Sequence, residues 1–223
     1  MHTLPTYHRS AVILAAVLFL GGCTSPRSAA DTQYDVLVTG GMVLDGTGAA
    51  ARSADVAIRG DRIVRVSDTP LDPEGAGRVI DAEGMVVAPG FIDVHAHLDP
   101  ILRLPDAESH VRQGVTTALG GPDGGSPLPL AAHLDSLETL GIGMNVGYLV
   151  GHNTVRRRVM GLEDRAPSED ELTEMEGLVA RAMGDGAFGI STGLKYLPGA
   201  FADLDEVVAL SRVASDSGGF YTS

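Results

Sequence analysis

Residues 85–97 read MVVAPGFIDVHAH, an apolar run broken by Pro89-Gly90 that ends in two histidines. Residues 91–94, at the end of this run, have the pattern of a short buried strand. Because residues two apart on a strand point to the same side, His95 and His97 are expected on one face of the strand end. Imidazole nitrogens bind zinc at about 2.0–2.1 Å. The segment therefore predicts a strand that delivers a pair of metal ligands, although two histidines also fall close together by chance.

The bulk composition limits the classes of function. The chain has 223 residues, is 44% hydrophobic and carries a net charge of −13. It can therefore bury a sizeable core, and it has no basic surface that would release phosphate counterions, which excludes nucleic acid as a partner. The basic run 156–158 is best explained as a solvated helix edge, and a role in holding an anionic substrate is the alternative.

The N-terminus has the layout of an export signal. Residues 1–22 contain Arg9 before a wholly apolar run, which is followed by Leu-Gly-Gly and Cys23, the only cysteine. This ending resembles a bacterial lipobox, which implies lipid attachment at Cys23 and a tether over residues 23–33. We therefore expect an exported lipoprotein, anchored on the periplasmic side of a membrane or at the cell surface. An ordinary signal peptide or an uncleaved anchor is the alternative.

Residues 34–90 are rich in short strands separated by turns. The expected strands are 34–39, 42–44, 54–59, 62–66, 79–81 and 85–87. Gly40-Gly41 is expected to stop the first strand, and Gly60-Asp61 has the composition of a two-residue hairpin loop. This segment predicts the N-terminal part of a small β-sandwich domain.

From residue 91 onward, strands alternate with helices. Further strands are expected at 115–119, 144–150, 187–191 and 220–222, with helices at 128–140, after the capping box at 168–171, and at 204–214. This alternation predicts an α/β fold in which residues 91–223 form the first half of a (β/α)8 TIM barrel. Because such barrels need about 250 residues, we expect the sequence to be part of a longer protein, the alternative being an open five-stranded sheet.

Polar residues follow each expected barrel strand. Asp123 comes after the second strand, His152 after the third, and Ser191, Thr192 and Tyr196 after the fourth. Side chains at the carboxyl ends of barrel strands meet at one mouth, so these residues are expected to share a site with the two histidines.

Several motifs resemble a known family. Residues 46–48 (GTG), 60–63 (GDRI) and 88–97 (APGFIDVHAH) are similar to the amidohydrolase superfamily. Residues 114–117 (GVTT), 151–156 (GHNTVR), 189–196 (GISTGLKY) and 218–223 (GGFYTS) resemble the N-acyl-D-amino-acid deacylases, or D-aminoacylases. The resemblance runs from about residue 34 to the end.

The resemblance implies a hydrolase of linear amides that deacylates N-acyl-D-amino acids with one or two Zn²⁺ ions. It also implies a general-base aspartate on the eighth barrel strand and further metal histidines on strands five and six, all expected beyond Ser223. No catalytic residue is therefore expected within these 223 residues, which alone are expected to be inactive. The alternatives are a cyclic-amide hydrolase, a dipeptidase, or a surface lipoprotein that is not an enzyme.

One departure from the family concerns the third ligand. Deacylases of this type often have Gly-Asn-Cys-Gly after the second strand, with the thiolate on the metal, whereas this chain has Gly-Pro-Asp-Gly at 121–124. A carboxylate is an acceptable zinc ligand, so Asp123 is expected to replace the cysteine beside His95 and His97. The alternative is a simple turn residue between Pro122 and Gly124.

Three residues are candidates for contact with substrate. Lys195 and Tyr196 follow the fourth strand, and we interpret them as binding the substrate's carboxylate. Lys195 lies beyond the expected strand end, which argues against a metal-bridging carboxylated lysine and leaves a solvated loop residue as the alternative. His152 is expected to hydrogen-bond the substrate, or otherwise to cap a loop.

Overall fold

The computed structural model describes residues 32–223. The predicted signal segment 1–22, the lipid-attachment residue Cys23 and all of the tether except its last two residues lie outside this range. Among residues 32–223 there is no helix of the length and hydrophobicity needed to cross a membrane. The chain divides into two compact units, with the division between Ala88 and Pro89.

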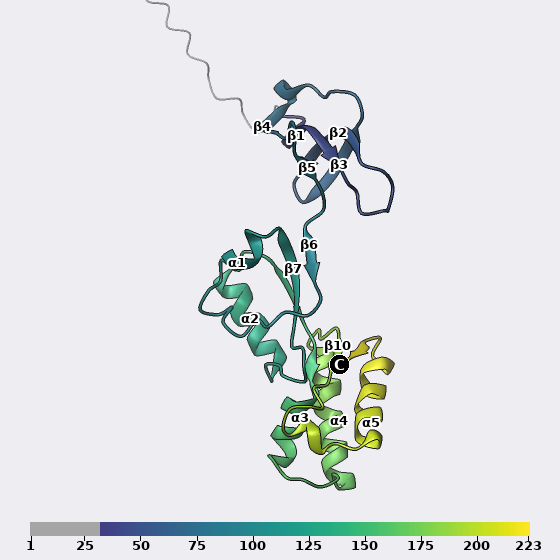
Figure 1. Ribbon diagram of the computed structural model, residues 1–223. Coiled ribbons are helices and arrows are strands. Elements are labelled where there is room, and N and C mark those ends of the chain that lie inside the picture. The colour runs from purple at the N-terminus through teal and green to yellow at the C-terminus, as the bar shows by residue number, and fades with distance from the viewer. Residues whose placement is uncertain (1–31) are drawn as a thin grey trace, which may run out of the picture. The chain divides into compact units, whose positions relative to one another are not determined.

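The first unit is a single mixed sheet (Figure 1). Its strands are β1 (Tyr34–Val43), β2 (Arg52–Arg59), β3 (Arg62–Ser67), β4 (Ala76–Asp81) and β5 (Val86–Val87), with the 3₁₀ turn η2 (Pro73–Gly75) before β4. The order is β3-β2-β1-β4, and β5 also pairs with β1. β1 runs antiparallel to β2 and parallel to β4 and β5. The described residues of this unit therefore form one sheet, and the sandwich stays a prediction.

The prediction that Gly40-Gly41 stops the first strand was wrong. β1 continues through both glycines, with a register shift against β2 between Val38 and Gly41. Gly40 has a φ of +71°, and its N–H donates to Asp55 Oδ1 at 2.9 Å. A bulge therefore absorbs the glycine pair while a side chain satisfies the displaced backbone group. The Gly60-Asp61 hairpin between β2 and β3 is confirmed.

The second unit contains parallel strands that follow one another in chain order. They are β6 (Phe91–Asp93), β7 (Val115–Gly120), β8 (Asn145–Tyr148), β9 (Val150–Gly151), β10 (Gly189–Ser191) and β11 (Phe220–Thr222). The predicted strand 144–150 is divided at Leu149: β8 pairs with β7, and β9 pairs with β10. The resulting order, β6-β7-β8 and then β9-β10-β11, is that of the N-terminal part of a TIM barrel.

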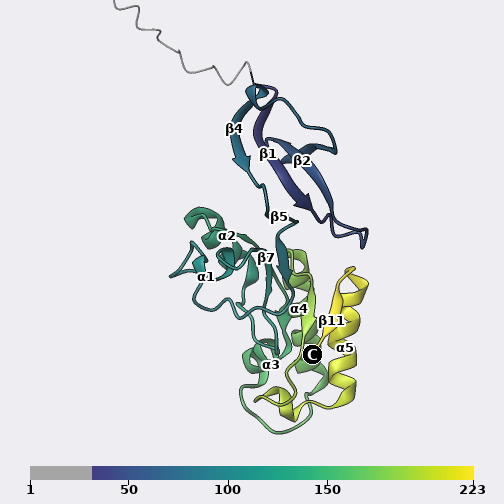
Figure 2. The same cartoon turned by 45° about the horizontal axis from the view of Figure 1, so that its top comes forward.

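Helices occupy the connections between these strands. They are α1 (Glu108–Val111), α2 (Leu130–Leu140), α3 (His152–Met160), α4 (Glu169–Gly184) and α5 (Leu204–Asp216), with the 3₁₀ turn η3 (Gly199–Phe201) before α5. α4 and α5 lie side by side (Figure 2), and α5 packs on β10 and β11. The α4 side chains Met175, Val179 and Ala182 are buried in the core, as the predicted apolar face required.

The start of α4 is fixed by the predicted capping box. Ser168 Oγ accepts from the Glu171 N–H at 3.3 Å, and Glu171 Oε2 accepts from the Ser168 N–H at 2.8 Å. Arg165 also donates to both oxygens of Glu171, at 2.6 and 2.7 Å. The Arg165 guanidinium is the main reason that the pKa of Glu171 falls to about 2, and the Ser168 backbone contributes further.

We expect Glu171→Gln to remove part of the acid sensitivity of folding. A carboxyl whose pKa is lower in the folded chain stabilises it above the unfolded-state pKa. That contribution is lost as the pH falls from about 4.5 to about 2. The free energy of unfolding of the variant should therefore fall less than that of the parent between neutral pH and about pH 3, measured by urea titration. Glu169→Gln, in the same turn, is the control and should follow the parent.

Candidate metal centre

The chain leaves β6 in a conformation that keeps both histidines on one side. The Asp93 carboxylate accepts from the His95 N–H at 3.0 Å, and the Ala96 N–H donates to Leu119 O at 3.0 Å. Ala96 is only 3% exposed, whereas the side chains of His95 and His97 are 53% and 63% exposed. The alternation of a strand thus continues past Asp93 and presents two imidazoles at the strand end.

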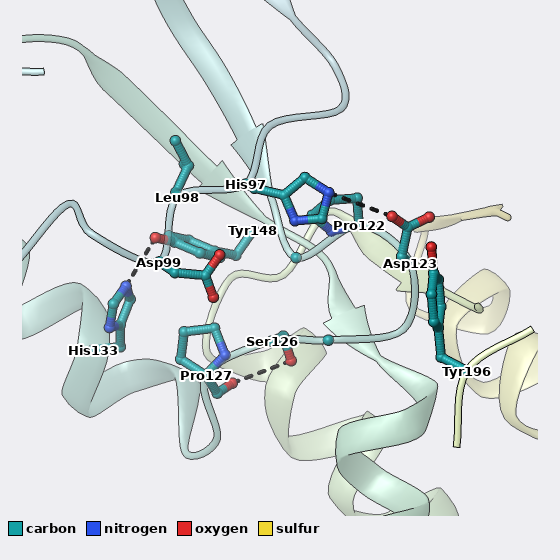
Figure 3. A pocket seen from close by; sticks show the side chains of 12 residues that line it. His97, Leu98, Asp99, Pro122, Asp123, Ser126, Pro127, His133, Tyr148 and Tyr196 are labelled. Atoms are coloured by element: carbon teal, nitrogen blue, oxygen red, sulfur yellow. Dashed lines mark hydrogen bonds and ion pairs between the residues drawn. The ribbon is translucent and has the colours of Figure 1, made fainter. Parts of the chain in front are cut away.

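Asp123 reaches the histidines from a tight turn after β7. Its φ is +55°, a left-handed conformation that aspartate tolerates better than most residues, and glycines at 121 and 124 have φ values of +77°. Its Oδ2 lies 3.5 Å from His95 Nε2 and 3.4 Å from His97 Nε2. Figure 3 shows His97 and Asp123 facing each other on the lining of a cavity. The structure therefore brings the three predicted ligands together.

The spacing of these atoms fits a metal ion. Bonds of about 2.0–2.1 Å to a tetrahedral Zn²⁺ place neighbouring ligand atoms about 3.4 Å apart. Both nitrogen–oxygen separations match this value and exceed normal hydrogen-bond lengths. The three ligand atoms all lie within 4.8 Å of one another. Two imidazoles and one carboxylate are also a donor set that zinc accepts.

A buried serine holds the Asp123 turn in place. Ser191, at the end of β10, is fully buried; its Oγ accepts from the Gly124 N–H at 3.0 Å and donates to Gly121 O at 2.5 Å. The Thr154 N–H also donates to Gly124 O, at 3.1 Å. The sequence places Ser191 at the barrel mouth but gives no sign of this clamp, because its partners lie about seventy residues earlier.

We expect Ser191→Ala to destabilise the chain by about 1–3 kcal/mol, since the buried Gly124 N–H and Gly121 O would each lose a partner. The measurement is the free energy of unfolding in urea. Ser136→Ala is the control, because the Ser136 hydroxyl is exposed and bonds only within its own helix. A loss no larger than that of the control would contradict the clamp.

Two of the candidate ligands, His97 and Asp123, border a cavity of about 660 Å³ within the second unit. Figure 3 shows Asp123 and Tyr196 on one side, and Asp99, His133 and Tyr148 on the other. His133 Nε2 and the Tyr148 hydroxyl are 2.9 Å apart. Burial, and secondarily the Asp99 charge, raises the pKa of Tyr148 to about 12, and burial lowers the pKa of His133. At neutral pH this side therefore combines an uncharged hydrogen-bonded pair with one carboxylate.

Sequence reasoning did not identify this second side of the cavity. His133 belongs to a predicted helix and Tyr148 to a predicted strand, so the sequence context of neither residue differs from that of a core residue. One feature of the sequence points to this side of the cavity: Asp99 follows the second histidine of the motif by two residues.

The three predicted substrate contacts lie in different surroundings. Tyr196 lines the cavity beside Asp123 (Figure 3). Lys195 is exposed and is not among the residues that line the cavity. His152 is fully buried outside the cavity lining, with its Nε2 2.8 Å from Glu206 Oε1. The substrate contacts of all three stay predictions, and the geometry favours Tyr196.

The barrel order places this candidate ligand set at the carboxyl ends of the strands, where TIM-barrel enzymes have their active sites. Residues 78–223 match the amidohydrolase family, and the chain belongs to that family.

The chain is also similar to individual proteins with more specific names than the family. The chain is 37% identical over 221 residues to a D-aminoacylase of Alcaligenes xylosoxydans xylosoxydans, covering 88% of this chain and 45% of the relative. A structure of D-aminoacylase, described as having a binuclear metal centre, aligns with a TM-score of 0.78 at 37% identity, over 84% of this chain and 44% of the other.

A third relative is the N-acyl-D-glutamate deacylase of Bordetella bronchiseptica, solved with zinc and a phosphonate inhibitor that mimics the tetrahedral intermediate. It aligns with a TM-score of 0.80 at 36% identity, over 85% of this chain and 44% of the other. The chain thus spans less than half the length of each of these three relatives.

Proposed function

We propose that this protein is a zinc-dependent amide hydrolase that removes the acyl group from N-acyl-D-amino acids. The observation that carries the proposal is the convergence of His95, His97 and Asp123 at the ends of two barrel strands. Support comes from relatives at 36–38% identity that are named as D-aminoacylase and as N-acyl-D-glutamate and N-acyl-D-aspartate deacylases.

His95, His97 and Asp123 would together hold one Zn²⁺ ion. The resemblance implies that the complete site holds one or two such ions. When bound, such an ion supplies Lewis-acid polarisation of a carbonyl and a water of lowered pKa. Asp123 brings a negative charge to the ligand set, in the place where the resemblance to the deacylases implies a thiolate. Its turn, closed by Ser191, keeps the carboxylate aimed at both imidazoles without reorganisation.

The remaining cavity residues would orient the substrate. Tyr196 lies beside Asp123 and offers a hydroxyl and a ring face to a group near the metal ligands. We propose that Lys195, exposed next to it, pairs with the substrate's carboxylate. At the other side of the cavity, the Tyr148–His133 pair would form a hydrogen bond with the acyl group or the side chain of the substrate.

The test is hydrolysis by the full-length gene product loaded with Zn²⁺. N-acetyl-D-amino acids are the substrates, with their L-enantiomers as matched controls, and cyclic amides and dipeptides complete the panel. We expect turnover of D-substrates only, abolished by Asp123→Ala. Absence of D-selective turnover in a protein shown to contain bound metal would overturn the substrate class, and turnover of the cyclic amides or dipeptides alone would replace it.

We propose that the 223-residue chain alone binds metal but does not hydrolyse the substrate. The aspartate base that the resemblance implies belongs to the eighth barrel strand, whereas the described barrel strands run from β6 to β11 and match the first five. Deacylation by the 223-residue chain itself would overturn this part of the proposal.

We further propose that the protein is exported and anchored through a lipid on Cys23. The support is the sequence alone, in which the sole cysteine follows an apolar run and Leu-Gly-Gly. Radiolabelled palmitate should enter the protein in a bacterial host, and Cys23→Ser should abolish this labelling. Labelling that persists in Cys23→Ser, or unlabelled parent protein, would overturn the anchor.

A further inference from the structure

A buried cluster of titratable side chains lies outside the cavity lining. His152 and Arg156 on α3 are fully buried, and Glu206 on α5 is 1% exposed. Glu206 accepts from His152 Nε2 at 2.8 Å and from Arg156 Nη1. Arg156 Nη2 also donates to the carbonyls of Glu163 and Arg165, at 3.2 and 2.7 Å. The cluster therefore joins α3, α5 and the loop before α4 at a fixed spacing.

Asn153 lies between this cluster and the segment that carries Tyr196. Its side chain is buried, and its Oδ1 lies 3.2 Å from His152 Nδ1. Its Nδ2 donates to the carbonyls of Gly193 and Tyr196, at 3.3 and 3.4 Å. One amide thus holds both ends of the turn 193–196 against the first turn of α3.

The same amide also supports the metal-ligand turn. A Cβ placed on Gly124 would lie 2.5 Å from Asn153 Oδ1, so the backbone beside Asp123 rests directly on this side chain. A Cβ placed on Gly193 would lie 2.1 Å from Asp123 O, so the two turns also touch each other. Only glycine permits this approach, and Asn153 lies at the point where both turns meet.

We propose that Asn153, which lies beside the His152–Arg156–Glu206 cluster on α3, is a positioning residue that fixes Asp123 and Tyr196 relative to each other. Asn153 itself contacts neither metal nor substrate. This inference rests on the proposed metal site, because the consequence it predicts is a change in metal binding. Groups that orient metal ligands typically contribute 10- to 100-fold in metal affinity, so about tenfold is expected for a residue that acts on one ligand through its backbone.

The first experiment compares Co²⁺ affinities of the 223-residue chain and its variants by competition with a chromophoric chelator. Asn153→Ala removes the amide, and Asn153→Asp keeps its size but cannot donate to the two carbonyls. We expect both to lower the affinity about tenfold while the circular dichroism spectrum is unchanged. Asn145→Ala is the matched control, because Asn145 donates to Thr116 O at an exposed position. Folded Asn153 variants with parental affinity would overturn the proposal.

A second measurement needs no variant to fold. The parent chain is titrated with Zn²⁺ while nuclear magnetic resonance follows the side-chain amide of Asn153, the backbone amide of Tyr196 and the side-chain amide of Asn145. We expect the first two signals to shift with the metal-binding midpoint and the third to stay constant. Metal binding without these shifts would overturn the positioning role alone, whereas the absence of any metal binding would overturn the proposed metal site.

Discussion

Replacing Asp123 by alanine is expected to lower the affinity of the chain for Zn²⁺ or Co²⁺ by more than about 100-fold, the upper limit for groups that only orient ligands. Asp123 Oδ2 is the atom that both imidazoles face, at 3.5 and 3.4 Å. Without the Asp123 carboxylate, only the two exposed histidines at the end of β6 would remain as ligands. Titration calorimetry, or competition with a chelator, measures the change.

Asp99→Ala is the matched control for this prediction. Asp99 lines the same cavity, and no hydrogen bond or ion pair joins it to either histidine within the described residues. Its removal should change the metal affinity by less than about threefold, since only a screened, longer-range charge is lost. Equal losses in the two variants would mean that the cavity's charge, and not ligation by Asp123, attracts the ion.

Asp123→Cys provides a spectroscopic form of the same test. A thiolate at this position would supply the sulfur ligand that the resemblance to the deacylases implies, with a zinc–sulfur bond of about 2.3 Å. The Co²⁺-loaded variant should therefore show a sulfur-to-metal charge-transfer band in the near ultraviolet. Because Cys23 is present in the parent, the comparison is made in Cys23→Ser protein. Absence of the band in metal-loaded protein would contradict the placement of residue 123 beside the ion.

Glu206→Ala is expected to destabilise the chain by about 3–5 kcal/mol, the usual result of removing one partner from a buried ion pair. Arg156 and His152 would both remain buried without their shared acceptor. Such a loss is a large fraction of the stability of a typical domain. Urea unfolding followed by circular dichroism measures it, at low temperature if the variant is marginal.

Asp205→Ala is the control for Glu206→Ala, because Asp205 is the adjacent, exposed acidic residue in the first turn of α5. It should cost less than about 1 kcal/mol, since it loses only a favourable position near the positive end of the helix. A Glu206→Ala variant as stable as Asp205→Ala would show that the buried cluster does not hold α3 and α5 together.

The sequence was sufficient for the parts of the structure that depend on local rules. The alternation of a strand put His95 and His97 on one side, and the common mouth of parallel barrel strands brought Asp123 to them. The capping box at Ser168 and Glu171 and the hairpin at Gly60-Asp61 are also local patterns, and both were confirmed.

Other features depend on partners that are distant in the sequence. His152 looked like a residue of the barrel mouth, but Glu206, 54 residues later, binds its ring in a buried cluster. The clamp of Ser191 on Gly124 spans 67 residues. Gly40-Gly41 reads as a strand end, yet Asp55 on the neighbouring strand stabilises a bulge there. Each outcome was decided by a buried polar group that found its partner only in the folded chain.

Zinc K-edge X-ray absorption of the Zn²⁺-loaded chain tests the metal centre most directly, because it reports the ligands themselves. The structure predicts two imidazoles at about 2.0–2.1 Å together with oxygen ligands, and the loss of one imidazole in His95→Ala and in His97→Ala. A zinc environment without imidazole, or one that keeps both imidazoles when either histidine is replaced, would contradict the assignment of His95, His97 and Asp123 as the metal site.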